Sequence, residues 1–357
     1  MTVAAPRPEY LPPGTTVGAY EVEEQVGAGG FGFLYRVRRD GRVYALKIGR
    51  QRLSALPPEE RVHLEERLDR EIAALASLRH PNIVRVHSFE RWPDLEGGYP
   101  YLVMDYVEGS RLDDWRAATA PSLARICEVF AKIATAVEHI HRLGIFHRDL
   151  KSANVLVRTD GEPIIIDFGI ARPRIATDVT RAATVGTVTH FAPEYARYFD
   201  SAAFSRGEAF DWQPTTDLYA IGYMLYEVLT GEPPFPRGTE SDPAAESRIL
   251  HSIKTVLPRR PRERNDRIPA ALDELAMRLL DKDPSKRVQT AGELVAALRE
   301  ASDQARAGGE RSWDDPFDLP GSGPGAQDGH GSAPEGEDDE EIEGLDISQH
   351  GEAGYTH

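Results

Sequence analysis

A single change in the spacing of apolar residues constrains the fold of this chain more than any other feature. Residues 20–48 alternate apolar and polar side chains between turn residues, a pattern that predicts antiparallel strands. Residues 59–78 have helical spacing, and residues 83–89 and 101–106 return to strand character. From Leu112 onward the helical period dominates. We therefore expect an α+β fold of two lobes, a small antiparallel sheet with one main helix followed by a larger, mostly helical lobe.

Charge separates the C-terminal segment from the rest of the chain. Of the net charge of −16 in 357 residues, residues 301–357 carry −13, from 15 Asp and Glu against 2 Arg. A segment with so few large apolar side chains cannot bury enough surface to offset its ordering entropy. We expect a flexible leader over residues 1–18, a folded unit with lobes of residues 19–106 and 107–300, and a disordered, acidic, Gly- and Pro-rich tail over residues 301–357.

Several classes of protein are disfavoured by composition. The one cysteine, Cys127, excludes an intramolecular disulfide and a multi-cysteine metal site. The acidic balance argues against binding nucleic acid through bulk charge. The first 14 residues lack the apolar core of a secretory signal, and the longest strongly apolar stretch, residues 218–226, is shorter than the roughly 20 residues of a membrane-spanning helix. We expect a cytoplasmic protein with no nucleic-acid partner and no membrane segment.

A glycine-rich turn and a lysine follow one another in the strand-rich part. Gly27, Gly29 and Gly32 would let backbone N–H groups approach a phosphate, although a plain glycine-rich hairpin has the same pattern. No helix begins after the third glycine, which disfavours a dinucleotide site. Lys47, in the following apolar strand, could hold a phosphate oxygen or be an ordinary strand-edge lysine. Glu71, on the expected helix, is the best candidate for its counter-charge.

The loop His147-Arg-Asp-Leu-Lys-Ser-Ala-Asn154 concentrates reactive side chains between a long helix and an apolar strand. The carboxylate of Asp149 can orient a hydroxyl and accept its proton. The ammonium of Lys151 can neutralise charge on a transferring phosphoryl group. The amide oxygen of Asn154 can bind a hard cation such as Mg²⁺. This combination favours phosphoryl transfer over a plain polar loop.

Two further motifs follow that loop. Asp167 ends a buried strand in Ile164-Ile-Ile-Asp-Phe-Gly169, where a carboxylate is a natural metal ligand or simply a turn former. Glu194 ends the sequence Ala-Pro-Glu. Together with Asp217 and Arg287 it offers charges for structural pairing in the helical part.

In this order, the glycine turn, Ala-x-Lys, His-Arg-Asp-x-Lys-x-x-Asn, Asp-Phe-Gly and Ala-Pro-Glu resemble the motifs of the protein kinase family. The resemblance is to the bacterial, eukaryotic-like Ser/Thr kinases and covers about residues 20–300. It implies a bilobal kinase fold that transfers the γ-phosphoryl group of ATP to Ser and Thr hydroxyls of proteins. It also implies ATP with Mg²⁺, or Mn²⁺ in its place, protein substrates, and self-association for autophosphorylation in trans.

The resemblance implies a role for each residue of these motifs. The implied catalytic residues are Asp149, Lys151, Lys47 and Glu71. The implied metal ligands are Asn154 and Asp167. The implied ATP-binding residues are Val26, Gly27, Gly29, Gly32, Leu34, Ala45, Lys47, Met104, Asp105, Val107 and Leu156. The implied structural residues are Arg148, Glu194, Asp217 and Arg287.

The implied activation segment runs from Asp167 to Glu194. Thr180 and Thr184 are its candidate phosphorylation sites, because a phosphate there could pair with Arg148. Thr187 matches the threonine of the P+1 loop, the segment that contacts substrate beside the acceptor residue.

The sequence departs from the family pattern at several positions. Ser152 stands where proline is common, and Leu34 stands where valine is usual. His190 stands where tyrosine is usual, and this replacement would alter the P+1 pocket. Residues 198–213 form an insertion whose aromatic side chains either pack on the helical lobe or present a docking surface.

Two other functions share part of this pattern. A nucleotide-binding pseudokinase that acts as a scaffold through its tail would lack catalytic residues, and none is missing here. A small-molecule phosphotransferase would generally lack Ala-Pro-Glu and the threonine-rich segment. An active Ser/Thr protein kinase is therefore the favoured interpretation.

Overall fold

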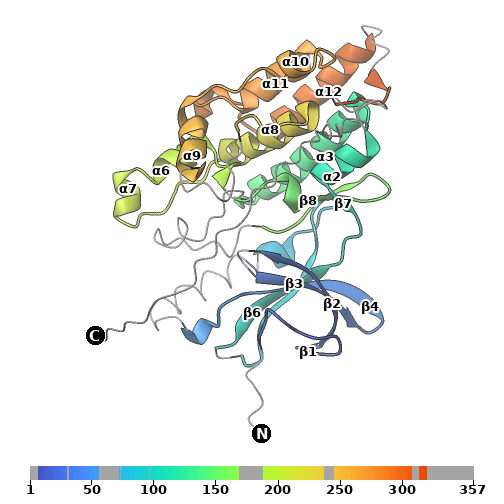
Figure 1. Ribbon diagram of the computed structural model, residues 1–357, viewed down its shortest axis with the longest axis vertical. Coiled ribbons are helices and arrows are strands. Elements are labelled where there is room, and N and C mark those ends of the chain that lie inside the picture. Colours follow the sequence, from blue (N-terminus) through green and yellow to red (C-terminus); the bar gives the residue numbers. More distant parts are fainter. Residues whose placement is uncertain are drawn as a thin grey trace, which may run out of the picture. The chain divides into compact units, whose positions relative to one another are not determined.

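In the computed structural model, strands dominate the chain up to Asp105 and helices dominate it from Leu112 onward, as the spacing of apolar residues predicts (Figure 1). This arrangement confirms the predicted α+β fold class. The chain divides into a unit of residues 1–320 and a unit of residues 321–357. The structure describes residues 7–29, 32–55, 72, 74–95, 97–168, 188–236, 245–307 and 313–319.

Alternating apolar residues build the N-terminal sheet. Its strands are β1 (Thr16–Val17), β2 (Tyr20–Gly29), β3 (Gly32–Arg39), β4 (Arg42–Ile48), β5 (Val86–Trp92) and β6 (Tyr99–Asp105). Within the described residues they form one antiparallel sheet in the order β1-β2-β3-β4-β6-β5. One face packs a cluster of apolar side chains that includes Val22, Tyr35, Val37, Leu46 and Val103.

The start of β3 requires a glycine. Gly32 has φ of +153°, and a Cβ on it would stand 2.1 Å from the carbonyl oxygen of Ile48 on the neighbouring strand. Any side chain would therefore push β3 away from β4. Of the helix predicted over residues 59–78, only the end lies in the described part, where residues 72 and 74–77 are helical.

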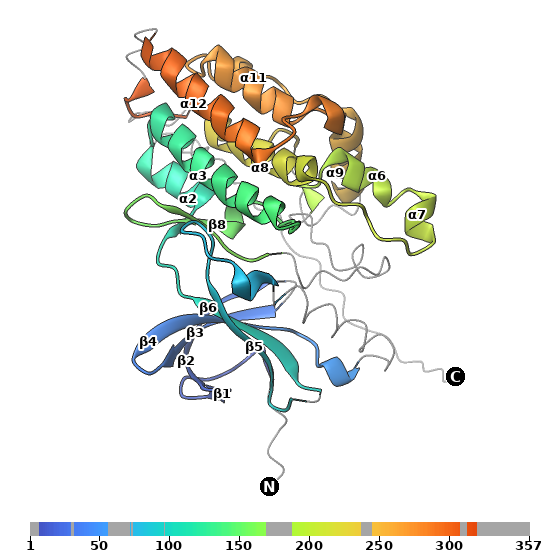
Figure 2. The same ribbon diagram turned by 180° about the vertical axis from the view of Figure 1, so that it is seen from behind.

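Helices build the C-terminal part, where α3 lies beside α12 along much of its length (Figure 2). The predicted stripe of α3, which includes Ile126, Phe130 and Ile133, is fully buried. Among the described residues, no helix combines the length and the apolar character needed to cross a membrane. The helices are α2 (Leu112–Thr119), α3 (Leu123–Arg142), α6 (Pro193–Tyr198), α7 (Ala202–Ser205), α8 (Pro214–Thr230), α9 (Ala245–Thr255), α10 (Pro261–Arg264), α11 (Ala270–Leu279) and α12 (Ala291–Ala307).

Short elements complete this part. A small antiparallel sheet joins β7 (Ser110–Arg111), β8 (Val155–Val157) and β9 (Pro163–Ile165). Three 3₁₀ turns are described, η1 (Leu53–Ala55), η2 (Ser152–Asn154) and η4 (Pro284–Lys286).

Helix α8 is the most deeply buried helix of the described residues. It begins with Pro214 and ends before Gly231, which has φ of +75°. A Cβ on Gly222 would lie 2.4 Å from the Cβ of Leu279, so this glycine lets α8 and α11 pack closely. The helix therefore serves as a fixed support for the segments that contact it.

The predicted flexible leader over residues 1–18 is wrong for its described part. The hydroxyl of Tyr35 donates to the carbonyl of Pro8 (2.8 Å) and accepts from the N–H of Leu11 (3.2 Å). Leu11 and Val17 are buried, and Val17 belongs to β1. The proline-rich composition of this segment did not predict these contacts, because composition gives no information about a partner such as Tyr35 in a distant strand.

The predicted start of the disordered tail at residue 301 is also wrong. Helix α12 continues to Ala307, and Trp313 and Phe317 are buried in the helical core. The guanidinium of Arg116 donates to the carbonyl of Phe317, and that of Arg267 donates to the carbonyl of Pro316 (3.1 Å). We call residues 313–319 the C-terminal clip. Residues 320–357 of the predicted tail lie outside the described residues.

Packing against the C-terminal clip also changes the pKa of Arg116. Removal from water, partly offset by the charge of Asp318, lowers the pKa of Arg116 to about 10. The side chain therefore stays a cation at neutral pH. Its guanidinium donates hydrogen bonds to the carbonyls of Val228 and Phe317. The guanidinium carbon lies 5.4 Å from the centre of the Phe317 ring.

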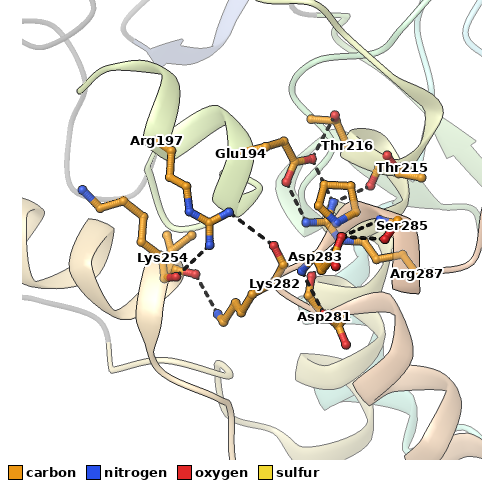
Figure 3. A network of polar contacts seen from close by, with 12 residues as sticks. Glu194, Arg197, Thr215, Thr216, Lys254, Asp281, Lys282, Asp283, Ser285 and Arg287 are labelled. Carbon is orange, nitrogen blue, oxygen red and sulfur yellow. Dashed lines mark hydrogen bonds and ion pairs between the residues drawn. The ribbon is translucent and has the colours of Figure 1, made fainter. Parts of the chain in front are cut away.

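A buried ion pair joins α6 to the segment before α12 (Figure 3). Arg287, which is 1 % exposed, donates to both carboxylate oxygens of Glu194, at 2.8 and 2.6 Å. It also donates to the carbonyls of Thr215 (2.9 Å) and Asp281 (2.8 Å), while the hydroxyl of Thr216 donates to Glu194 (3.1 Å). Of the three charges that the sequence offered for structural pairing, Glu194, Asp217 and Arg287, the first and the last are thus each other's partners.

Arg287→Met should be strongly destabilising. The change leaves the carboxylate of Glu194 without its bidentate donor, and breaking a buried pair in this way typically costs about 3–5 kcal/mol. Urea unfolding of both proteins measures the loss. As a control, Arg278→Met removes an exposed pair with Glu293 and should cost no more than about 1 kcal/mol. Equal losses in the two variants would contradict the structural role of Arg287.

Phe317→Ala should also destabilise the fold, by about 3–5 kcal/mol, because it empties a fully buried site of the C-terminal clip. The exposed Leu257, changed to Ala, provides the control and should have little effect on unfolding. If both variants unfold at the urea concentration of the wild type, the clip is not part of the folded unit.

Candidate functional site

The loop of residues 147–154 is held by one carboxylate at the N-terminus of α8. Asp217, which is 2 % exposed, accepts the backbone N–H groups of His147 (2.9 Å) and Arg148 (3.0 Å). The imidazole of His141 lies 2.9 Å from the same carboxylate. Burial alone would raise the pKa of Asp217, but its hydrogen bonds with the His141 side chain and the His147 backbone N–H outweigh burial, and the net pKa is lowered. The group therefore stays ionised at neutral pH.

The buried ring of His147 orients the next part of the loop. Burial lowers the pKa of His147, against the attraction of Asp217, Asp149 and Asp167, so the ring is neutral at pH 7. Its Nδ1 accepts the backbone N–H of Asp149 (3.3 Å). Its Nε2 must then carry the proton and donate to the carbonyl of Ile166 (3.3 Å). This ring links the loop to the strand end that precedes Asp167.

Asp149, Lys151 and Asn154 converge within the loop. The side-chain amide of Asn154 donates to the carbonyl (2.7 Å) and the carboxylate (3.1 Å) of Asp149. The ammonium of Lys151 lies 3.4 Å from the same carboxylate. Because Asn154 uses its nitrogen in these bonds, its amide oxygen is available to a cation.

Asp167 meets Lys47 across 120 residues of sequence. The ammonium of Lys47 on β4 forms an ion pair with the carboxylate of Asp167, just after β9. Asp167 has φ of +56°, an uncommon conformation for a residue with a side chain. The side chain of Phe168 packs in the hydrophobic core, and the centre of its ring lies 4.6 Å from the centre of the His147 ring. Glu71, the predicted partner of Lys47, lies outside the described residues.

Most of the apolar residues predicted to contact ATP lie in one cluster. Ala45 pairs in register with Met104, and both are buried, while Leu34 and Val107 pack against them. Val84, Ile164 and Ile166 belong to the same cluster, although the sequence did not predict them as part of it. Nothing in their local pattern distinguishes them from ordinary strand residues.

The other predicted ATP-binding residues lie at the margins of this cluster. Val26 on β2 is partly exposed, and Leu156 pairs with Ile164 in the small sheet. Asp105 donates its backbone N–H to the carbonyl of Arg85 (3.0 Å), and its carboxylate lies 2.7 Å from His87. Its N–H is therefore already used within the protein.

A hollow of about 20 Å³ opens beside Asp149, enough space for a water molecule. Its lining includes Arg148, His190, Tyr195 and Trp212. The guanidinium carbon of Arg148 lies 5.9 Å from the centre of the Trp212 ring. The insertion of residues 198–213 thus reaches the catalytic loop.

The aromatic side chains of the insertion also pack against one another. Tyr195 on α6 contacts Phe210 at 4.9 Å and Trp212 at 4.7 Å between ring centres, and Tyr198 contacts Phe204 at 5.4 Å. Packing on the helical part, one of the two expectations for this insertion, accounts for these contacts.

The predicted threonines of the activation segment fall in a part of the chain that the structure leaves out. Thr180, Thr184 and Thr187 all lie between residues 169 and 187, which are outside the described residues. Within the described ranges, no group of three or more His, Cys, Asp or Glu side chains is arranged to hold a metal ion.

Comparison with known proteins gives the family. A model of the protein kinase domain matches residues 20–297. A probable serine/threonine-protein kinase of Clostridium perfringens is 33 % identical over 283 residues, which are 78 % of this chain and 38 % of that protein. The serine/threonine-protein kinases PknB and PknJ of Mycobacterium tuberculosis are 35 % identical over 285 residues and 32 % identical over 301 residues.

Both mycobacterial alignments also cover most of this chain. They include 78 % of it for PknB and 82 % for PknJ, but 42 % and 46 % of those two proteins. The chain thus spans less than half the length of these curated relatives. The order of the motifs, the two-part fold and these similarities agree. The chain therefore belongs to the protein kinase family, among the bacterial serine/threonine-protein kinases.

Proposed function

We propose that this chain transfers the γ-phosphoryl group of ATP to Ser and Thr hydroxyls of proteins. The observation that carries the proposal is the arrangement around Asp149, whose carboxylate is held by Asn154 and lies 3.4 Å from the ammonium of Lys151. Lys47 and Asp167 form an ion pair that joins the sheet to the same region. An oriented base, a cation and two oxygen ligands are what phosphoryl transfer requires.

The residues of this chain fit ATP with a divalent cation, which the family generally uses. The amide oxygen of Asn154 and the carboxylate of Asp167 are hard oxygen ligands. Two protein ligands suffice for Mg²⁺, since this ion usually keeps waters and binds phosphate oxygens. On β2, no heavy atom lies within 4 Å of the place that a Cβ on Gly29 would take, which leaves the strand open to a phosphate. We propose Mg²⁺ as the ion, with Mn²⁺ as an alternative.

Each group has a distinct task in the proposed reaction. ATP with its metal ion supplies the phosphoryl group and part of the charge neutralisation. Asp149 orients the substrate hydroxyl and accepts its proton. Lys151 offsets negative charge as it moves onto the transferring group. Lys47 holds phosphate oxygens, and Asn154 keeps the carboxylate of Asp149 in place.

Ser and Thr hydroxyls of proteins, rather than tyrosines or small molecules, are favoured by two features. Lys151 stands where serine/threonine kinases carry lysine, and the Ala-Pro-Glu motif is anchored by the pair of Glu194 and Arg287. No catalytic position is missing from the sequence, so the scaffold alternative is not favoured. The Ala-Pro-Glu motif and the threonine-rich segment, which small-molecule phosphotransferases generally lack, disfavour the other alternative.

Regulation and location complete the proposal. We propose that Thr180 and Thr184 are phosphorylated by a second copy of the chain and that the phosphate pairs with Arg148. A cytoplasmic location is supported by the one cysteine, Cys127, which is buried and free. The acidic balance of the chain supports the absence of a nucleic-acid partner.

Asp149→Asn should abolish phosphorylation. Loss of a positioned base typically costs about 10²- to 10⁴-fold in rate. Lys47→Met should have a comparable effect, because phosphate oxygens lose their cation. The measurement is transfer of labelled phosphate from ATP with Mg²⁺ to the chain itself and to myelin basic protein.

The control is Asp114→Asn, which changes an exposed carboxylate on α2 and should label like the wild type. Wild-type labelling by Asp149→Asn would rule out the proposed mechanism. A wild type that labels neither itself nor the added protein would contradict the proposed function.

A further inference from the structure

Arg50, two residues beyond the end of β4, contacts the glycine-rich turn although it belongs to none of the sequence motifs. Its Nε donates to the carbonyl of Gly29 at the end of β2 (2.8 Å). Its guanidinium carbon lies 4.4 Å from the centre of the Phe33 ring on β3. Strands β2, β3 and β4 are neighbours in the sheet (Figure 1). One side chain therefore joins the ends of three strands beside the turn.

The backbone that carries Arg50 is anchored to the rest of the sheet. The N–H of Gly49 donates to the carbonyl of Pro100 on β6 (2.8 Å). The Cα of Gly49 also lies 3.3 Å from the place that a Cβ on Gly32 would take, so this segment lies against the start of β3. Phe33 is 7 % exposed and packs in the apolar cluster of the sheet. Arg50 thus reaches the turn from a fixed base and against a fixed ring.

Arg50 and Lys47 act from opposite faces of the sheet. Lys47 pairs in register with Leu34, so these two side chains share a face, and Leu34 packs on the cluster predicted to contact ATP. Phe33 is the neighbour of Leu34 in β3, and successive side chains of a strand point to opposite faces. Because Arg50 lies against Phe33, its charge is not on the face of Lys47. Any effect of Arg50 on ATP therefore passes through the backbone of the turn.

We propose that Arg50 is a positioning residue that holds the Gly29 end of the glycine turn where the turn binds the phosphates of ATP. The proposal rests on the proposed kinase function, in which backbone groups of this turn bind phosphate oxygens. Without the contact, part of the binding free energy of the nucleotide is spent on ordering the turn. Arg50 therefore acts on the affinity for ATP and not on the affinity for the protein substrate.

The shape of the arginine side chain suits both of its contacts. A guanidinium group is planar, so it can lie against an aromatic ring while an N–H in its plane donates to a carbonyl. A lysine ammonium carries the same charge without the planar face or the Nε donor. Arg50→Lys therefore separates a positioning role from simple attraction of the negatively charged phosphates.

The first measurement is binding of the non-hydrolysable analogue AMP-PNP with Mg²⁺ by titration calorimetry, which does not depend on phosphoryl transfer. For both Arg50→Met and Arg50→Lys we expect the Kd to rise about three- to tenfold, the usual effect of losing one hydrogen bond. The matched control is Arg42→Met at the start of β4, where the guanidinium carbon lies 5.8 Å from the centre of the Tyr44 ring. This control should bind the analogue like the wild type.

Two further measurements test the route of the effect. The KM for ATP should rise by a similar factor in both Arg50 variants, while the KM for myelin basic protein stays unchanged. Since the ring of Phe33 supports the guanidinium, Phe33→Leu should weaken binding of AMP-PNP less in the Arg50→Met background than in the wild type.

The proposal would be overturned by wild-type affinity in Arg50→Met, by recovery in Arg50→Lys or by an equal loss in Arg42→Met. Additive effects of Phe33→Leu and Arg50→Met, or a parallel rise in the KM for myelin basic protein, would also contradict it. Arg50 is exposed, so its variants should fold, and urea unfolding checks this. A wild type that binds no AMP-PNP would instead contradict the proposed function.

Discussion

The catalytic loop depends on one buried carboxylate, that of Asp217 at the N-terminus of α8. It accepts two consecutive backbone N–H groups, from His147 and Arg148, and these bonds fix the direction in which the loop leaves α3. A buried backbone donor without a partner is costly, so the loop has no equally favourable position once it is released. The placement of Asp149 follows, because its own N–H is bound to the ring of His147.

The rest of the helical part keeps this carboxylate in place. Helix α8 is buried along almost its whole length and packs closely on α11 at Gly222. The pair of Glu194 and Arg287 ties α6 to the carbonyl of Thr215, two residues before Asp217. A structural ion pair far from the reacting atoms therefore supports the geometry of the site.

The sequence predicted the two-part fold and placed the candidate residues of the catalytic loop side by side, because both depend on local patterns. Strand alternation and helical spacing are visible in short windows, and the residues of the catalytic loop are adjacent in the chain. The predicted ends of the folded unit, at residues 19 and 300, were wrong for a physical reason, since Leu11 and Phe317 are buried by partners far away in sequence.

The most direct test of this account is the rate of phosphoryl transfer by Asp217→Asn at saturating ATP. The amide keeps one acceptor oxygen but sets an N–H₂ group against a backbone donor, so the loop should shift while the substrates can still bind. A displacement of about 1 Å can cost about a hundredfold in rate. We expect a loss of about that size in a protein that remains folded. A folded variant with the wild-type rate would contradict the central role of Asp217.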